Sequence, residues 1–146
     1  MGTTEAEQHA DLVRRDIEEI WNEERYDLVE ELYAEDFVHH DPAYPGEIRG
    51  PEGQEEFVRT YNTAFPGSPS ISIEEILVDD DMVAVRWTGH GTHEETFMGI
   101  EPTQEEMDVS GMSMARIEDG KIAEMWSNYD ALGMMSRIGA VEPPAE

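Results

Sequence analysis

The sequence predicts an α+β domain whose helices precede its strands. Residues 5–66 carry apolar residues at helical spacing, whereas residues 71–130 carry the alternating and β-branched runs typical of strands. A strong turn signal, Asp119-Gly120, joins the last two of these runs and indicates an antiparallel hairpin. Because segregated helices and strands pack as separate layers, we expect a strongly curved, mostly antiparallel sheet with the N-terminal helices packed on its concave face.

The first helix is expected over residues 5–24. Thr4 and Glu7 have the spacing of a capping box, in which each side chain bonds to the backbone N–H of the other residue. The apolar positions that follow fall on one stripe of the helix, which we expect to face the core. These positions are Val13, Ile17, Ile20 and Trp21.

Two shorter helices are expected next. The second begins at Asp27. Its inward-facing side chains are expected to be Leu28, Val29, Leu32 and Tyr33. Residues 37–41 then lead into a loop rich in proline and glycine. Pro51 suits the first turn of a third helix, whose buried stripe includes Tyr61 and which ends at Pro66.

Four strands and a short C-terminal helix complete the expected fold. The strands are expected over residues 71–78, 82–92, 107–117 and 122–130. A helix over residues 131–137 follows the last strand. The proline-rich tail, residues 140–146, is expected to fray.

The Asp119-Gly120 turn sets the expected register of the final hairpin. A type I′ turn needs positive φ at both central residues, and it places Ile117 opposite Ile122. Alternation along the strands then assigns one mixed polar and apolar face, which we interpret as a pocket wall. This face carries Gly111, Ser113, Ala115, Glu124, Trp126, Asn128 and Asp130.

The opposite face of the hairpin is mostly apolar. A patch of this extent seldom stays exposed, so we expect it to form the interface of a homodimer. It comprises Met112, Met114, Met125, Ser127 and Tyr129.

Length and composition narrow the class of protein. The 146 residues fit a single domain, expected over residues 1–146. No apolar run approaches the roughly 20 residues that span a bilayer, and the N-terminus lacks the pattern of a secretory signal, so we expect a soluble, cytoplasmic protein without a membrane partner. The absence of cysteine excludes disulfides, thiolate metal ligands and a thiol nucleophile.

The chain is strongly acidic. It has 35 acidic and 9 basic residues and a formal charge of −26, and the acids are spread through segments with clear periodicity. With Lys121 as the sole lysine, this composition is typical of proteins from salt-accumulating halophiles, which is our interpretation; an acidic surface adapted to a basic partner is the alternative. Nucleic acid is not an expected partner, because no basic stripe is present to neutralise phosphates.

An ordered set of short motifs runs along nearly the whole chain. Its first half comprises Phe37, His40-Asp41-Pro42, Gly50 and Ala64-Phe65-Pro66. Its second half comprises Gly91-Thr92-His93, Gly99-Ile100-Glu101-Pro102-Thr103, Asp119-Gly120-Lys121-Ile122, Glu124, Trp126, Asp130 and Gly133. No single motif is specific, but the ordered set resembles the SnoaL-like polyketide cyclase and ester cyclase family of the NTF2-like superfamily.

The resemblance implies a cone-shaped α+β barrel with a deep apolar pocket, often a dimer, and chemistry without a cofactor. In characterised polyketide cyclases, a pocket aspartate acts as the acid/base of an intramolecular aldol ring closure. By motif, the resemblance places this role on Asp130. The residue alone also permits a structural interpretation, in which Asp130 is the N-cap of the C-terminal helix.

The other candidate site residues each have two interpretations. We expect His40 to relay a proton beside Asp130 and Trp126 to form pocket wall, although its indole N–H could orient a substrate oxygen. Glu124 is either a second pocket acid or an ion-pair partner of Arg116 or Arg86. Asn128 shares the expected pocket face, so it is a further substrate-binding candidate.

Two candidates lie outside the hairpin. Arg86 would stabilise an enolate or bind a carboxylate if it pointed into the cone, and otherwise it faces solvent. Tyr61 lies on the buried stripe of its helix, where its hydroxyl either reaches the cavity or only packs in the core. No metal is expected, because strand alternation sends His39 and His40 to opposite sides.

The expected function is a cofactor-independent cyclase, isomerase or hydrolase. It would act by acid/base chemistry on a small, largely apolar carbonyl compound in the cone pocket. A non-catalytic small-molecule binding module of the same fold is the alternative, and a structural dimer with a vestigial cavity is a third possibility.

Overall fold

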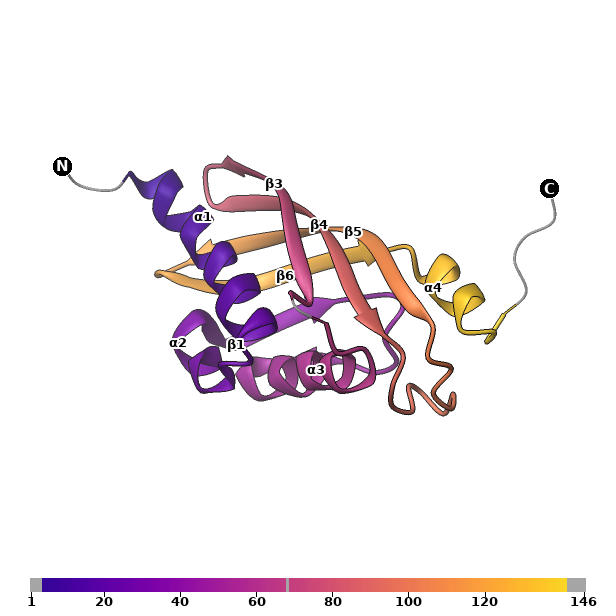
Figure 1. The fold of residues 1–146 in the computed structure, drawn as a ribbon. Coiled ribbons are helices and arrows are strands. Elements are labelled where there is room, and N and C mark those ends of the chain that lie inside the picture. Colours follow the sequence, from indigo (N-terminus) through magenta and orange to yellow (C-terminus); the bar gives the residue numbers. More distant parts are fainter. Residues whose placement is uncertain (1–3, 68, 142–146) are drawn as a thin grey trace.

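A computed structural model describes residues 4–67 and 69–141 and has the expected α+β architecture (Figure 1). The helical segments are α1 (Glu5–Arg15), a π-helical continuation η1 (Asp16–Asn22), a 3₁₀ turn η2 (Tyr26–Leu28), α2 (Val29–Leu32), α3 (Gly50–Ala64) and α4 (Ala131–Arg137). The strands are β1 (Tyr33–His40), β2 (Ile48–Arg49), β3 (Ile71–Asp79), β4 (Met82–Thr92), β5 (Glu106–Glu118) and β6 (Lys121–Tyr129). The predicted fold class is therefore confirmed.

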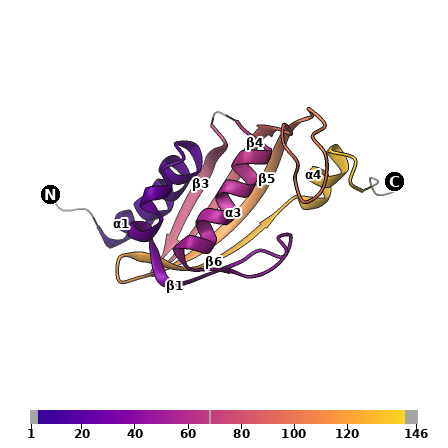
Figure 2. The same cartoon turned by 90° about the horizontal axis from the view of Figure 1, so that it is seen from below.

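The six strands form one sheet in the order β2-β1-β6-β5-β4-β3. All neighbours are antiparallel except β1 and β6, which run parallel. Seen from below, α1 and α3 lie side by side across one face of this curved sheet (Figure 2). The main core lies between the helices and the sheet, and its fully buried side chains include Ile20, Leu32, Tyr33, Phe37 and Val58.

The first helix begins as the capping signal predicts. The Glu7 backbone N–H donates to the Thr4 hydroxyl oxygen at 3.1 Å. The helix ends at Asn22 instead of residue 24, and its second half widens into the π-helical segment η1. Widened turns of this kind are frequent at functional sites. Here the segment turns Asp16 inward beside Ile17.

The sequence interpretation failed around β1. Tyr33 begins this strand instead of ending the second helix, and residues 37–40 belong to the strand instead of a lead into a loop. Pairing with β6 overrides the helical pattern, because it buries Tyr33 and Phe37 against the sheet. The two-residue strand β2 was not predicted.

The final hairpin has the predicted turn but not the predicted register. Asp119 and Gly120 have φ values of 52° and 75°, as a type I′ turn requires, and Ile117 pairs with Ile122. A β-bulge then inserts Ala123 into β6, so that Arg116 pairs with Glu124. One extra residue sends every later side chain of β6 to the other face.

This bulge also corrects the expected dimer surface. Met112 and Met114 are 61 % and 46 % exposed on the outer face, as expected. Met125, Ser127 and Tyr129 instead line the interior. The outer face carries a cross-strand row made of Leu77, Ala84, Met114, Trp126 and His40.

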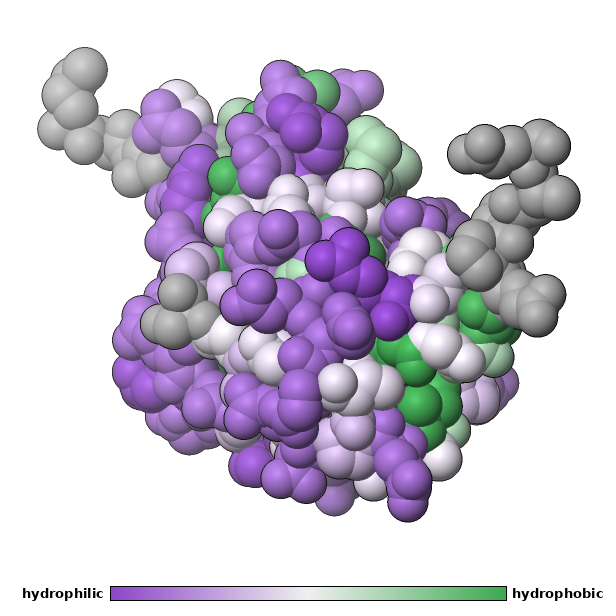
Figure 3. All heavy atoms as spheres, turned by 45° about the vertical axis from the view of Figure 1, so that its right-hand side comes forward, coloured by the Kyte–Doolittle hydropathy of each residue, from purple (hydrophilic) through white to green (hydrophobic). Residues whose placement is uncertain are grey.

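The far end of the molecule has a second apolar cluster, made by α4 and the loop that joins β4 to β5. Phe97, Met107 and Met134 are buried there. The surface in the space-filling view is mostly hydrophilic, with a hydrophobic area at this end (Figure 3). Of the tail expected to fray, residues 142–146 lie outside the described part of the chain.

Candidate functional site

A cavity of about 120 Å³ lies between the helices and the concave face of the sheet. Its wall is mostly apolar and includes Ile17, Phe57, Val85, Val109 and Met125. A small number of polar side chains interrupt this wall. An apolar cavity with few polar groups is the usual form of a small-molecule site.

Asp16 is the most deeply placed carboxyl group of this wall. It is 3 % exposed, and the Tyr33 hydroxyl donates a hydrogen bond to its Oδ1. Burial disfavours the charged form and raises the pKa of Asp16 to about 8. At neutral pH this carboxyl group is therefore mostly protonated.

Asp16 is one end of a continuous chain of seven hydrogen-bonded side chains. Gln54 joins Tyr33 to His39, with 3.4 Å from the amide nitrogen to the Tyr33 hydroxyl and 2.9 Å from Oε1 to His39 Nδ1. His39 Nε2 lies 2.8 Å from the Ser127 hydroxyl. The remaining links are 2.7 Å from Ser127 to Ser113 and 3.0 Å from Trp87 Nε1 to Ser113.

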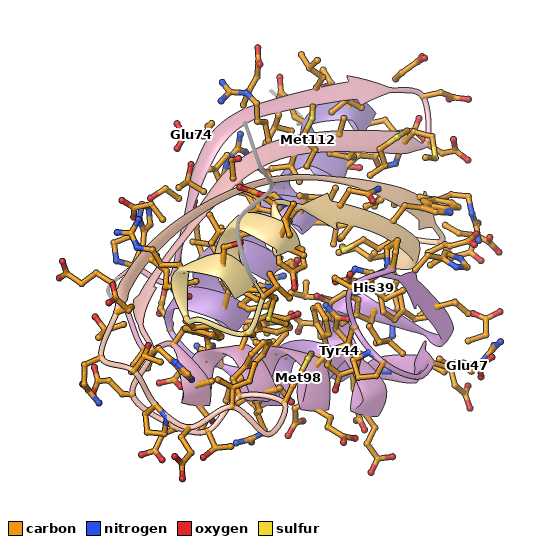
Figure 4. All side chains as sticks on the ribbon, turned by 90° about the vertical axis from the view of Figure 1, so that its right-hand side faces the viewer. His39, Tyr44, Glu47, Glu74, Met98 and Met112 are labelled. Atoms are coloured by element: carbon orange, nitrogen blue, oxygen red, sulfur yellow. The ribbon has the colours of Figure 1, made fainter. Side chains whose placement is uncertain are left out.

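His39 is the centre of this chain. It extends from β1 toward α3, where it meets Gln54 (Figure 4). Burial is the main cause that lowers the pKa of His39 to about 4, and the nearby His40 adds to it. The ring is thus neutral at physiological pH, with one nitrogen that donates and one that accepts.

A second polar group of the cavity wall consists of Asp41, Tyr61 and Tyr129. The two tyrosine hydroxyls are 2.7 Å apart and form a hydrogen-bonded pair. Burial is the main cause that raises the pKa of both, to about 12 for Tyr129, and the charge of nearby Asp41 adds to the shift. Burial also raises the pKa of Asp41, whose Oδ1 accepts the Ala43 backbone N–H at 2.9 Å.

Three of the predicted site residues come together on the outer face of the sheet, away from the cavity. His40 stacks on Trp126 with 5.5 Å between ring centroids, and its Nε2 lies 2.7 Å from Glu124 Oε2. Arg116 Nη2 is 3.4 Å from Glu124 Oε1, so the ion-pair interpretation of Glu124 applies. The β-bulge at Ala123 is the reason that Glu124 and Trp126 lie on this outer face.

The other predicted residues divide between the surface and the cavity. Asp130 is exposed, and its side chain caps α4 by accepting the Gly133 N–H at 2.9 Å. Asn128 is exposed on the outer face, and Arg86 lies 3.7 Å from Glu75 there. Tyr61 does reach the cavity, as its hydroxyl pairs with Tyr129.

Sequence reasoning missed Asp16 and His39, although a signal for each was present. Asp16 is an acidic residue on the stripe formed by Val13, Ile17 and Ile20, where an exposed charge has no place. The expected alternation of His39 and His40 is correct, but His39 is the one that points inward. Attention to buried polar positions would have found both.

Two structural findings concern metals and membranes. Among residues 4–67 and 69–141, no three His, Asp or Glu side chains are grouped so that they could hold a metal ion. Within the same ranges, no helix is long and apolar enough to span a bilayer.

A curved sheet closed by helices around one apolar cavity is the architecture of the NTF2-like class. The profile of the SnoaL-like polyketide cyclase family matches residues 11–138, and the chain belongs to this family. A search of curated proteins found no match.

Several solved structures share the fold. IdmH, a candidate polyketide cyclase from Streptomyces antibioticus, is 28 % identical with a TM-score of 0.76 over 90 % of this chain and 99 % of its own. A candidate SnoaL-like polyketide cyclase from Jannaschia sp. CCS1 is 23 % identical with a TM-score of 0.84 over 99 % of both chains. A candidate polyketide cyclase from Bacillus cereus is 23 % identical with a TM-score of 0.79, over 97 % of this chain and 87 % of its own.

Proposed function

We propose that this protein is a cyclase-type enzyme that acts without a cofactor on a small, largely apolar carbonyl compound. Membership of the SnoaL-like polyketide cyclase family supports the reaction class. The observation that carries the proposal is the carboxyl group of Asp41 beside the Tyr61–Tyr129 hydroxyl pair in the wall of an apolar cavity. This combination suits the removal of a proton next to a carbonyl group.

Asp41 is the proposed base. Burial raises the pKa of Asp41, which makes its carboxylate a stronger proton acceptor than that of an ordinary aspartate. In the tyrosine pair one hydroxyl donates to the other, which leaves one O–H free to donate to the substrate oxygen. The pair therefore stabilises the enolate formed when Asp41 takes the α-proton, and the enolate carbon then attacks a second carbonyl group to close the ring.

A non-catalytic binding module remains the second candidate. The observation that favours it is the capping role of Asp130, the aspartate to which the family motif assigns the chemistry. In that case the same cavity would hold a metabolite without converting it.

Ring closure of phenacylacetone tests the proposal. This diketone carries a phenyl group, and the aldol formed by ring closure loses water to give a conjugated cyclopentenone, whose formation is followed by absorbance. The wild type should accelerate closure, and Asp41→Asn should reduce the rate by roughly 10²-fold or more, because an amide cannot take up the proton. A ligand that binds without any turnover would instead support the binding module.

A further inference from the structure

The chain of seven hydrogen-bonded side chains has only one fully satisfied direction. The indole N–H of Trp87 can donate but cannot accept, so Ser113 accepts at this end. The Ser113 hydroxyl then donates to Ser127, and Ser127 donates to Nε2 of His39. Reversal would make Ser113 accept from both Trp87 and Ser127, which would leave its own hydrogen without an acceptor in the chain.

The same direction continues to Asp16. Because Nε2 of neutral His39 accepts, its Nδ1–H donates to Gln54 Oε1. The Gln54 amide N–H donates to the Tyr33 oxygen, and the Tyr33 hydroxyl donates to Asp16 Oδ1. Gln54 and Tyr33 are fully buried, so an unpaired donor along this path would be costly.

This arrangement decides where Asp16 carries its proton. Oδ1 accepts from Tyr33, so the acidic hydrogen of the neutral carboxyl group belongs on Oδ2. Within residues 4–67 and 69–141, the bond from Tyr33 to Oδ1 is the hydrogen bond of the Asp16 carboxyl group, which leaves Oδ2 without a partner there. Since Asp16 lines the cavity, Oδ2 is the oxygen that a ligand would meet.

We propose that this one-way chain makes Asp16 the proton donor of the cavity, with His39 and Ser127 as positioning residues that keep its acidic hydrogen on Oδ2. The inference deepens the proposed function and rests on it for the identity of the proton acceptor. During ring closure the new carbon–carbon bond forms as the π electrons of the attacked carbonyl move to its oxygen, which takes the Oδ2 proton. Asp41 ends protonated and Asp16 ionised, and proton exchange with water restores both.

Other titratable groups near Asp16 do not replace this explanation. Tyr33 contacts it from β1, and the rest of the cavity wall contributes His39, Asp41, Tyr61, Tyr129 and His90. Burial raises the pKa of Asp16 without a contribution from any neighbouring charge. The hydrogen bond from Tyr33 works against that rise, because it favours the ionised form.

Infrared spectroscopy of the free protein tests the inference without a substrate. The C=O stretch of neutral Asp16 is the carboxylic acid band that disappears in Asp16→Asn, and its intensity is followed as the pH is raised. Ser127→Ala interrupts the chain of hydrogen-bonded side chains in its middle. The Tyr33 hydroxyl is then no longer forced to donate to Asp16. The titration midpoint of this band should then rise by roughly half to one pH unit.

Two further variants sharpen the comparison. Ser113→Ala cuts the chain at the next link and should raise the midpoint in the same way. Ser136→Ala is the matched control, since its buried hydroxyl has no partner among the described residues and is not a member of the hydrogen-bonded chain; its midpoint should equal that of the wild type. Wild-type midpoints in both Ser127→Ala and Ser113→Ala would overturn the inference, as would the absence of the Asp16 band at neutral pH.

A rate measurement connects the inference to the reaction. The rate of phenacylacetone closure should fall as the pH rises through the Asp16 midpoint, and this falling limb should move to higher pH in Ser127→Ala. A variant that had only lost stability would show the fall in rate at the same pH as the wild type. An inactive wild type would count against the proposed function alone, because the infrared titration does not depend on turnover.

Discussion

At the scale of single residues, burial distinguishes Asp16 and Asp41 from the many exposed carboxyl groups of the chain. Asp130 fits the family motif, but it is exposed and its side chain is committed to capping α4. Asp16 and Asp41 both line the cavity, and burial raises the pKa of each. The motif therefore directs attention to Asp130, whereas burial directs it to Asp16 and Asp41.

The protonated state of Asp16 predicts an unusual dependence of stability on pH. Its folded-state pKa of about 8 lies above that of the unfolded chain, so the folded protein holds the proton more tightly. The contribution of this group is fully present below the unfolded pKa near 4 and is lost as the pH rises through about 8.

Asp16→Asn should remove this loss, since an amide does not ionise. Between pH 5 and 8, the unfolding free energy of the variant should rise relative to that of the wild type, by at most about 1.4 kcal/mol per pH unit. Urea unfolding at several pH values measures the difference. Parallel curves for the two proteins would show that Asp16 is ionised in the folded state.

At the scale of elements, local sequence patterns predicted most helices and strands, but not the irregularities within them that depend on packing. The capping box at Thr4 and the turn at Asp119-Gly120 are short-range signals, and both are present as predicted. The bulge at Ala123 and the π-helical turn at Asp16 depend on packing across the domain. No periodicity in the sequence announces a single inserted residue or a widened turn.

These two local irregularities decide the composition of the site. Without the bulge, Trp126 would face the cavity and Ser127 would lie on the outer face, where the sequence interpretation expected a dimer interface. With it, Ser127 joins His39 inside, and Trp126 stacks on His40 outside. Of the candidate substrate-binding residues, Tyr61, which lies on a regular helix, lines the cavity, and so do Ser113 and Ala115 of the expected pocket face, which precede the bulge's effect on β6.

At the scale of the whole molecule, charge is the dominant feature. Each arginine is in an ion pair with a carboxylate, and the remaining acids are unbalanced on a chain of net charge −26. Halophilic adaptation and the homodimer both remain predictions. The predicted dimer would be centred on the outer row around Met114 and Trp126, because Met125 and Tyr129 line the cavity.

Self-repulsion on such a surface predicts that stability depends on salt. The Debye length shrinks from about 10 Å at 0.1 M to about 3 Å at 1 M, so molar KCl should screen the carboxylates and raise the melting temperature steeply. A thermal melt across this range measures the effect. An unchanged melting temperature would favour the alternative, an acidic surface adapted to a basic partner.

The central claim is that Asp41 removes a proton from carbon beside a carbonyl group inside this cavity. The most direct measurement is the exchange of the methyl hydrogens of acetophenone for deuterium at neutral pH, followed by NMR. We expect the wild type to catalyse exchange, Asp41→Asn to lose roughly 10²-fold or more, and Asp130→Asn to match the wild type, because Asn caps a helix almost as well as Asp. Exchange that survives in Asp41→Asn but is lost in Asp130→Asn would contradict the account and return the chemistry to Asp130.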